Sequence, residues 1–517
     1  MTGKAPVVST SSDDTGSTDD TGSTVVSTSS TDEGGSTDEG GSAGVTPPVA
    51  WRQVLPPVVV VAVVLTVFSN GYGYDRDELY FSMLKPAWGY VDQPPLTPLL
   101  AHGLAALYDG GPWLLRIPAT LCGAACVLIT ALIARELGGA AKAQAWTAWG
   151  MATTSAVLLF GHVLLTSAPD LVAWGLVSLC VLRAELRDEP RWWLVAGAVA
   201  GLATYNKLLV AVLLAGIALG LLLVGPRRRL LSPYVWGAAA LTVLLGLPNI
   251  IYQLTHDLPQ LKMGQALADN NAGDVRVSMW YLLIVLLGPP LAVLWAIGLG
   301  ALWRDPRVRF FVVVFAVVVL FTFVSGAQPH YPVFILPIPF AAGVVAMQRH
   351  LGRVWGALFA VNGAVSLVLG LPIIPVGSVA ATPVTDVNLL AQDSIGWPAY
   401  VDQITAPYDA LPRKAGAVVI TSNYGEAGAV HHYRPEVPVY SAQNAMYDQA
   451  RPPEATTTVV FVGGQLDFAR RFFSCRVIDR LDNGVDVDNE EQGEPVALCT
   501  DPRLPWPTLW ERLHHLD

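Results

Sequence analysis

Long apolar runs dominate the chain from Val54 to about Val376. Each run comes close to the ~20 apolar residues that an α-helix needs to cross a bilayer. The runs lie at residues 54–69, 113–134, 143–165, 171–182, 192–206, 208–225, 233–252, 279–303, 310–326, 331–348 and 354–375. This pattern predicts a polytopic α-helical membrane protein with about eleven transmembrane helices.

The pattern changes on either side of these runs. Residues 1–49 repeat Ser, Thr, Asp and Gly with few bulky apolar side chains, so we expect a disordered tail that buries too little surface to fold. The short apolar runs beyond the membrane part lie at 418–421, 437–440 and 459–464. They predict a small α/β domain over residues 376–517, after a transmembrane part over 50–375 whose first external loop is 70–112.

Composition narrows the class of protein. The chain is 52% hydrophobic and 14% charged, which excludes an ordinary soluble enzyme of 517 residues. Its net charge of −10 comes mostly from the tail, where many acidic residues are balanced by Lys4 alone. The rest of the chain has no basic patch, so nucleic acid is not an expected partner.

Basic residues mark one side of the membrane. With a cytoplasmic amino terminus, the inner loops hold most of the loop arginines, among them Arg183, Arg187 and the run 227–229. The positive-inside rule therefore places the amino terminus and its tail in the cytoplasm. With eleven spans, the α/β domain then lies outside. Arginine far outnumbers lysine, which indicates a bacterial sequence and hence the bacterial plasma membrane.

The cysteines divide along the same lines. Cys122, Cys126 and Cys180 fall within the apolar runs and are expected to be packing residues. Cys475 and Cys499 fall in the external α/β domain, where an oxidising compartment permits a disulfide. We predict a bridge between these two residues.

Polar residues at the ends of the runs face one compartment in this topology. They are Asp75, Asp77, Glu78, Asp92, Asp170, Lys207, His256, His330 and Tyr331. Ionisable groups kept close to lipid are costly, and for that reason they tend to be functional. The alternative for each is an ordinary solvated loop residue.

The first external loop is the most informative segment. Asp77 and Glu78 open a helix-like stretch, DELYFSMLK, whose apolar positions 79, 80, 83 and 84 are expected to lie flat on the membrane. A carboxylate at a helix N-terminus stays ionised because the helix dipole favours it, and an ionised carboxylate suits a general base. The alternative is that the two acids only cap the helix.

Six motifs together carry a resemblance to a known family. They are RDELYF (76–81), GYVDQPPL (89–96), SAPD (167–170), YNK (205–207), PHYPVFILPIPFAAG (329–343) and SNYGEAGAVHHYRP (422–435). In this order they resemble the bacterial family-39-type membrane glycosyltransferases of the C-type superfamily, which includes protein O-mannosyltransferases and the aminoarabinose transferases of lipid A. The resemblance implies the C-type glycosyltransferase fold and a polyprenyl-phosphate-linked sugar as donor.

The resemblance also implies roles for the acids. Asp77 matches the catalytic acid of the family's Asp-Glu motif, Glu78 is its neighbour, and Asp170 matches a second acid, so these three are the predicted catalytic residues. Asp92 stands where relatives carry an acidic residue, and Gln93 replaces the lysine that follows it in the aminoarabinose transferases. A glutamine still donates a hydrogen bond, so Asp92 and Gln93 are counted among the substrate-binding residues.

The donor's phosphate gains negative charge as its bond to the sugar breaks. Lys207 matches a lysine that resembles a lipid-phosphate ligand, and His330 and Tyr331 are further donors on the same side. The chain has no GxGxxG after a strand and no P-loop, which fits a lipid donor rather than a nucleotide. Within YGEAGAV (424–430), Tyr424 and Glu426 are expected to cap the active site or to contact the acceptor, or the segment is a simple turn and helix start.

No cofactor is certain from the sequence. Asp77, Asp92 and His256 are a conceivable divalent metal site, but no tight ligand spacing such as HExxH supports it, so a metal-free site is favoured. The function predicted is an inverting transfer of a mannose or another hexose to an acceptor hydroxyl of a protein, glycolipid or polysaccharide. Two other classes stay open: a transporter or flippase of lipid-linked sugars, and a non-catalytic membrane scaffold.

Overall fold

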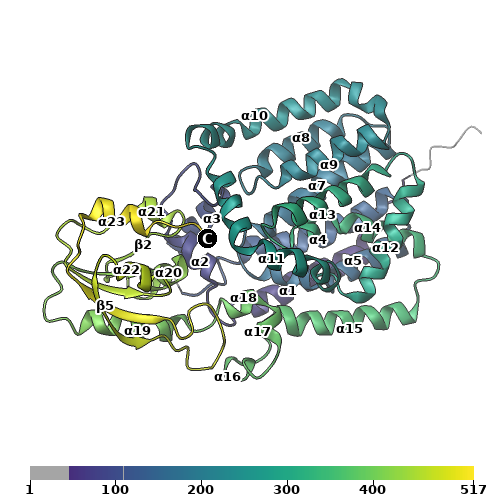
Figure 1. Cartoon of the computed structure of the whole chain (residues 1–517). Coiled ribbons are helices and arrows are strands. Elements are labelled where there is room, and N and C mark those ends of the chain that lie inside the picture. The colour runs from purple at the N-terminus through teal and green to yellow at the C-terminus, as the bar shows by residue number, and fades with distance from the viewer. Residues whose placement is uncertain (1–45, 109) are drawn as a thin grey trace, which may run out of the picture. The chain divides into compact units, whose positions relative to one another are not determined.

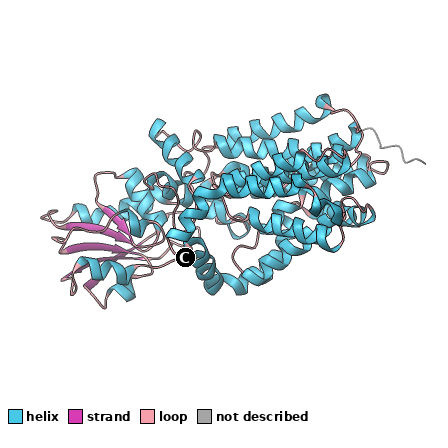
Figure 2. Cartoon of the chain, turned by 90° about the horizontal axis from the view of Figure 1, so that it is seen from above, coloured by secondary structure: helices cyan, strands magenta, loops and turns pink. Residues whose placement is uncertain are grey.

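The computed structural model describes residues 46–108 and 110–517. The predicted tail falls almost entirely on residues 1–45, outside the described part of the chain. The remainder consists of a helical part followed by a C-terminal part that contains the strands (Figures 1 and 2).

The helical part runs to Gly370 and contains fifteen α-helices among the described residues. They are α1 (Trp51–Phe68), α2 (Arg76–Met83), α3 (Leu96–Leu107), α4 (Ile117–Glu136), α5 (Ala141–Ala152), α6 (Ser155–His162), α7 (Ser167–Leu186), α8 (Trp192–Ala203), α9 (Val210–Leu223), α10 (Pro233–Thr255), α11 (Pro259–Val285), α12 (Pro289–Arg304), α13 (Phe310–Ser325), α14 (Pro337–Met347) and α15 (Arg353–Gly370), with the 3-10 helices η1 (Arg227–Leu231) and η2 (Tyr331–Ile335).

Many of these helices are apolar enough to lie in a membrane. Among the described residues, α1, α4, α7, α10 and α15 are each long and apolar enough to span a bilayer alone, and a bent pair, α11 and α12, adds a sixth candidate. The helices α3, α8, α9, α13 and α14 are apolar but shorter. The chain is therefore a multi-pass membrane protein, while the predicted count of about eleven spans is not confirmed.

Two predicted runs are wrong as continuous helices. The run 143–165 is broken between α5 and α6, where Thr154 caps the new helix by accepting the Val157 N–H. The run 279–303 divides between α11 and α12, which meet at an angle of 95°. Gly288 has a φ of 98° and two prolines follow it, so the backbone cannot continue as a helix through this point.

The C-terminal part forms a five-stranded mixed sheet with helices on it. Its elements are α16 (Val376–Val379), α17 (Val384–Val387), α18 (Leu389–Gln392), α19 (Trp397–Asp409), β1 (Ala417–Thr421), α20 (Tyr424–Tyr433), β2 (Val439–Ser441), α21 (Met446–Gln449), β3 (Thr458–Val462), α22 (Leu466–Ala469), β4 (Ser474–Arg480), β5 (Pro495–Thr500) and α23 (Trp506–Leu513). The strand order is β2-β1-β3-β5-β4. β1 pairs in parallel with β2 and β3, whereas β5 is antiparallel to β3 and β4.

The first three strands match the three predicted apolar runs, whereas β4 and β5 had no such signal. β4 is mostly exposed, because it lies at the edge of the sheet. Cys475 on β4 and Cys499 on β5 are directly opposite each other and form a disulfide. This is the pair that the sequence placed outside the membrane part.

Helix α2 does not lie on a membrane surface as expected. Leu79, Tyr80 and Leu84 are buried, at 2%, 1% and 0% exposure. They belong to one apolar core with residues of α19, α20 and the sheet. The apolar face of α2 therefore covers the C-terminal α/β region, which we define as residues 397–517, and α2 joins the two parts of the fold (Figure 1).

Candidate functional site

Asp77 lies in the first turn of α2, and a capping box fixes that turn. The Asp75 carboxylate accepts the Asp77 N–H at 2.9 Å, and the Glu78 carboxylate accepts the Asp75 N–H at 3.0 Å. These bonds satisfy amide groups that a helix start otherwise leaves without partners. The backbone that carries the Asp77 side chain is therefore held on both sides.

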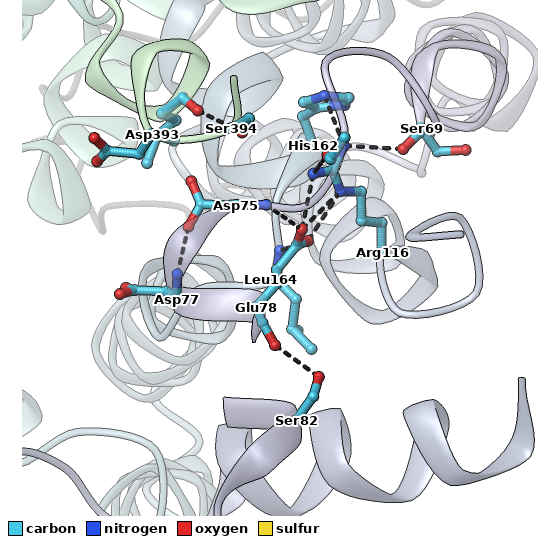
Figure 3. A network of polar contacts seen from close by, with 12 residues as sticks. Ser69, Asp75, Asp77, Glu78, Ser82, Arg116, His162, Leu164, Asp393 and Ser394 are labelled. Atoms are coloured by element: carbon cyan, nitrogen blue, oxygen red, sulfur yellow. Dashed lines mark hydrogen bonds and ion pairs between the residues drawn. The ribbon is translucent and has the colours of Figure 1, made fainter. Parts of the chain in front are cut away.

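Glu78 faces away from Asp77 and is completely buried (Figure 3). Its carboxylate pairs with the Arg116 guanidinium at 2.8 Å and also accepts the Leu164 N–H at 3.0 Å. Arg116 donates further to the carbonyls of Ser69 and Gly73, at 2.9 and 2.8 Å. These partners account for both oxygens of Glu78 within the protein, while its predicted catalytic role stays a prediction.

The Asp77 carboxylate is held at one oxygen only. Tyr424, at the start of α20, donates its hydroxyl to Asp77 Oδ1 at 2.9 Å. Among the described residues, Oδ2 has no hydrogen-bond partner. Burial raises the pKa of Asp77, while the charges of Arg76 and Lys207 and the bond from Tyr424 act in the opposite direction. This carboxylate is partly buried and keeps one oxygen available.

Asp92 is held by a second tyrosine, Tyr80, which contacts Tyr424. Tyr80 donates its hydroxyl to Asp92 Oδ2 at 2.9 Å, and the Tyr80 and Tyr424 rings pack at a tilt with centroids 4.4 Å apart. Burial raises the pKa of Asp92 to about 7. Asp92 Oδ1 and Gln93 Nε2 are buried without a hydrogen-bond partner in the described chain, so both can take a further polar contact.

A second group of predicted residues gathers where α7, α8 and η2 meet. Asn206 donates to Asp170 Oδ1 at 2.8 Å, and the next residue, Lys207, has its ammonium 4.8 Å from the centre of the Tyr331 ring. His330 Nε2 lies 3.3 Å from the Ser167 hydroxyl, one turn from Asp170. The Lys207 charge lowers the pKa of Asp77, so this cation is within electrostatic range of the acid at the start of α2.

Two predicted substrate-binding residues do not join this site. His256 is exposed at the end of α10, where its ring stacks on Tyr252 at 4.2 Å and contacts the Tyr252 carbonyl. Glu426 is fully buried and completes the capping box of α20 with Asn423. Burial and the neighbouring Glu491 raise the pKa of Glu426 to about 8. His256 ends its own helix, and Glu426 caps α20 through Oε2 while its Oε1 is buried without a hydrogen-bond partner in the described chain.

The conceivable metal site is not assembled. Within residues 46–108 and 110–517, no three His, Cys, Asp or Glu side chains are placed to hold a metal ion. Asp77 and Asp92 are each held by a tyrosine hydroxyl, and His256 contacts its own helix. The arrangement brings together an acid with a free oxygen, a cation and several hydrogen-bond donors.

Three residues that position the site were not singled out from the sequence. They are Tyr80, Arg116 and Asn206. Asn206 links α3 to α7, because it accepts from the Thr97 hydroxyl at 2.8 Å while donating to Asp170. Its polar character within an apolar stretch was the available signal. Arg116 looked like one more loop arginine, and only its burial at 1% exposure distinguishes it.

Comparison with solved structures identifies proteins with a similar fold. The described topology matches the crystal structure of ArnT from Cupriavidus metallidurans in the apo state with a TM-score of 0.57 and 15% sequence identity, over 87% of this chain and 98% of that chain. The structure of the same protein bound to undecaprenyl phosphate matches with a TM-score of 0.55 and 15% identity over the same shares. These matches show that the chain shares the fold of ArnT.

The sequence comparison agrees with the fold. A family model described as dolichyl-phosphate-mannose-protein mannosyltransferase matches residues 92–252, which include Asp92, Asp170 and Lys207. No curated protein matches the chain significantly. The resemblance to C-type membrane glycosyltransferases that the motifs indicated is confirmed.

Proposed function

We propose that this protein is a polyprenyl-phosphate-sugar-dependent glycosyltransferase that moves a mannose or another hexose to an acceptor hydroxyl. The observation that carries the proposal is the state of Asp77, which is fixed through Oδ1 by Tyr424 and free at Oδ2, within electrostatic range of Lys207. The match of residues 92–252 to a mannosyltransferase family model supports the sugar class. The binding of undecaprenyl phosphate by the similarly folded ArnT supports the lipid donor.

The reaction assigned to this site is a single inverting displacement. The acceptor oxygen forms a bond to the anomeric carbon as the bond from that carbon to the phosphate oxygen breaks, and the electron pair stays on the phosphate. Asp77 Oδ2 takes the hydroxyl proton as general base. Lys207, with His330 and Tyr331 beside it, stabilises the charge that develops on the polyprenyl phosphate. Asp170 and Asn206 hold Lys207's segment in place.

The proposal includes a side of the membrane. The site residues lie on the side opposite to the arginine-rich loops, which the positive-inside rule assigns to the cytoplasm. We place the site and the C-terminal α/β region on the outer face of a bacterial plasma membrane, with the amino-terminal tail inside.

The test is the exchange Asp77→Asn. Asn keeps the size and can still accept the Tyr424 hydroxyl, so folding should be retained while transfer falls by about 10²–10⁴-fold. Transfer is measured with membrane fractions and a radiolabelled polyprenyl-phosphate hexose, and Asp467→Asn, an exposed aspartate, is the control. Full activity in Asp77→Asn removes Asp77 from the mechanism. Movement of the intact donor across the membrane without cleavage of its sugar–phosphate bond favours a transporter.

A further inference from the structure

Residues from the far end of the chain reach the acid at the start of α2. Tyr424 is the first residue of α20, and its hydroxyl is the donor to Asp77 Oδ1 at 2.9 Å. Its backbone N–H donates to the Gln443 side chain at 2.7 Å, so the residue is fixed from the C-terminal α/β region. This region is thereby in direct contact with the proposed base.

The two helices approach closely because small residues separate them. A Cβ added at Gly428 of α20 would lie 2.9 Å from the Leu79 carbonyl carbon of α2. At Gly425 an added Cβ would lie 3.1 Å from the Arg76 Cβ. Larger side chains at these positions would push α20 away from α2, and the reach of the Tyr424 hydroxyl would then exceed a hydrogen bond.

The Tyr424 ring is also held by two neighbours. The Tyr80 ring packs against it at a tilt, with the centroids 4.4 Å apart, and the Arg76 guanidinium lies 4.9 Å from its ring centroid. Tyr80 is itself held by the Ala445 N–H, which donates to its hydroxyl at 3.2 Å. A tyrosine held in this way has little freedom to leave Asp77, and the bond it makes is to the one oxygen that the proton transfer does not need.

We propose that Tyr424 is a positioning residue for the transfer reaction and that the C-terminal α/β region completes the catalytic site by supplying it. The proposal rests on the assignment of Asp77 as the base. The Tyr424 hydroxyl fixes the rotation of the Asp77 carboxylate, so that Oδ2 faces the acceptor, and it stabilises the ionised form that accepts the proton.

The test is Tyr424→Phe, which keeps the ring contact with Tyr80 and removes the hydrogen-bond donor. We expect kcat to fall about 10- to 100-fold with an unchanged KM for the lipid donor, because orientation is lost and binding is not. The acid limb of the pH–rate profile should move to higher pH, because loss of a hydrogen bond to the charged form raises the pKa of Asp77. Tyr440→Phe, on β2 of the same region, is the matched control and should match the wild type.

A finer substitution covers the case in which Tyr424→Phe does not fold. Site-specific 3-fluorotyrosine at position 424 keeps the shape and makes the hydroxyl a stronger donor. The acid limb should then move to lower pH. Wild-type kcat and an unmoved acid limb in Tyr424→Phe, or an unmoved limb with fluorotyrosine, overturn the positioning role.

A measurement without turnover separates this inference from the proposed function. The infrared carboxyl band that disappears in Asp77→Asn reports the protonation of Asp77, and it should titrate at higher pH in Tyr424→Phe than in the wild type. If the wild-type enzyme transfers no sugar while this shift is present, the proposed function fails and the contact stands. If the enzyme is active and the band does not shift, the positioning role fails alone.

Discussion

Two neighbouring carboxylates on α2, Glu78 and Asp77, lie in different surroundings. On one side, Glu78 is sealed in the interior, where Arg116 and two backbone amides occupy its oxygens. On the other side, Asp77 is partly buried, with one oxygen held by Tyr424 and the other without a partner in the described chain. The residues are adjacent in the sequence, and the helix turns their side chains to different sides (Figure 3).

The difference shows how a single turn can serve both folding and chemistry. A buried ion whose hydrogen-bonding capacity is fully used stabilises its surroundings only as long as every partner stays. An acid with an unused oxygen beside a cation can exchange a proton. The Glu78–Arg116 pair holds the turn still, and Asp77 in the same turn keeps one oxygen without a partner in the described chain.

The largest effect on stability is expected from loss of the buried partner of Glu78. Arg116→Ala leaves Glu78 buried without its counter-charge, which should lower the free energy of unfolding by about 3–5 kcal/mol. The thermal unfolding midpoint in detergent measures this. Arg470→Ala removes an exposed ion pair with Asp467 and should change stability by less than about 1 kcal/mol. Equal shifts in the two variants would show that the interior pair is not special.

In the group around Asp77, Lys207→Met should lower kcat by on the order of 10²-fold with little loss of stability. The methionine keeps the contact with the Tyr331 ring but not the charge that stabilises the departing phosphate. Single-turnover transfer from the lipid donor measures the effect. Lys262→Met, on the exposed part of α11, is the control. A loss of activity in both lysine variants would point to a general effect of charge.

Glu78→Gln sharpens the comparison because it changes charge while keeping size. A glutamine side chain accepts fewer hydrogen bonds than the Glu78 carboxylate does. We therefore expect a stability loss of about 1–3 kcal/mol, smaller than for Arg116→Ala. Asp77→Asn should leave the unfolding midpoint close to the wild type. If the two amide variants were equally stable and equally inactive, Glu78 would take part in the reaction.

The last comparison concerns the pH dependence of stability. The pKa of Asp92 is raised to about 7 by burial, above the value of ~3.9 expected in the unfolded chain. The folded state therefore binds the proton more tightly, and this contribution to stability is present below about pH 4 and is lost as pH rises through 7. Asp92→Asn should reduce the pH dependence of the unfolding midpoint between these pH values. An unchanged slope would show that Asp92 does not titrate in this window.

Much of the fold was readable from the apolar pattern. The long runs predicted the helical part because the length and spacing of apolar residues do not depend on the tertiary arrangement, and strands β1, β2 and β3 were predicted from short apolar runs in the same way. The exposed edge strand β4 was not, since its residues alternate little between buried and exposed. The sequence also missed the break at Gly288, where a glycine and two prolines bend two apolar helices by 95°.

The candidate site divides along a similar line. Residue types and order were enough to point to Asp77, Asp92, Asp170 and Lys207, since acids and a cation at the ends of apolar runs are costly unless they are used. Their partners come from distant positions: Tyr424 lies 347 residues after Asp77. No local pattern records such a contact.

The sequence by itself determined a membrane-embedded helical chain with acids beside one end of its apolar runs. Tertiary structure decided which acid is available for chemistry, because that depends on the partners each side chain meets. Glu78 pairs with a buried arginine, whereas Asp77 accepts a hydrogen bond from a tyrosine at one oxygen only. Hydrogen bonding and burial set the use of a carboxylate, and both arise only when separate segments of the chain pack together.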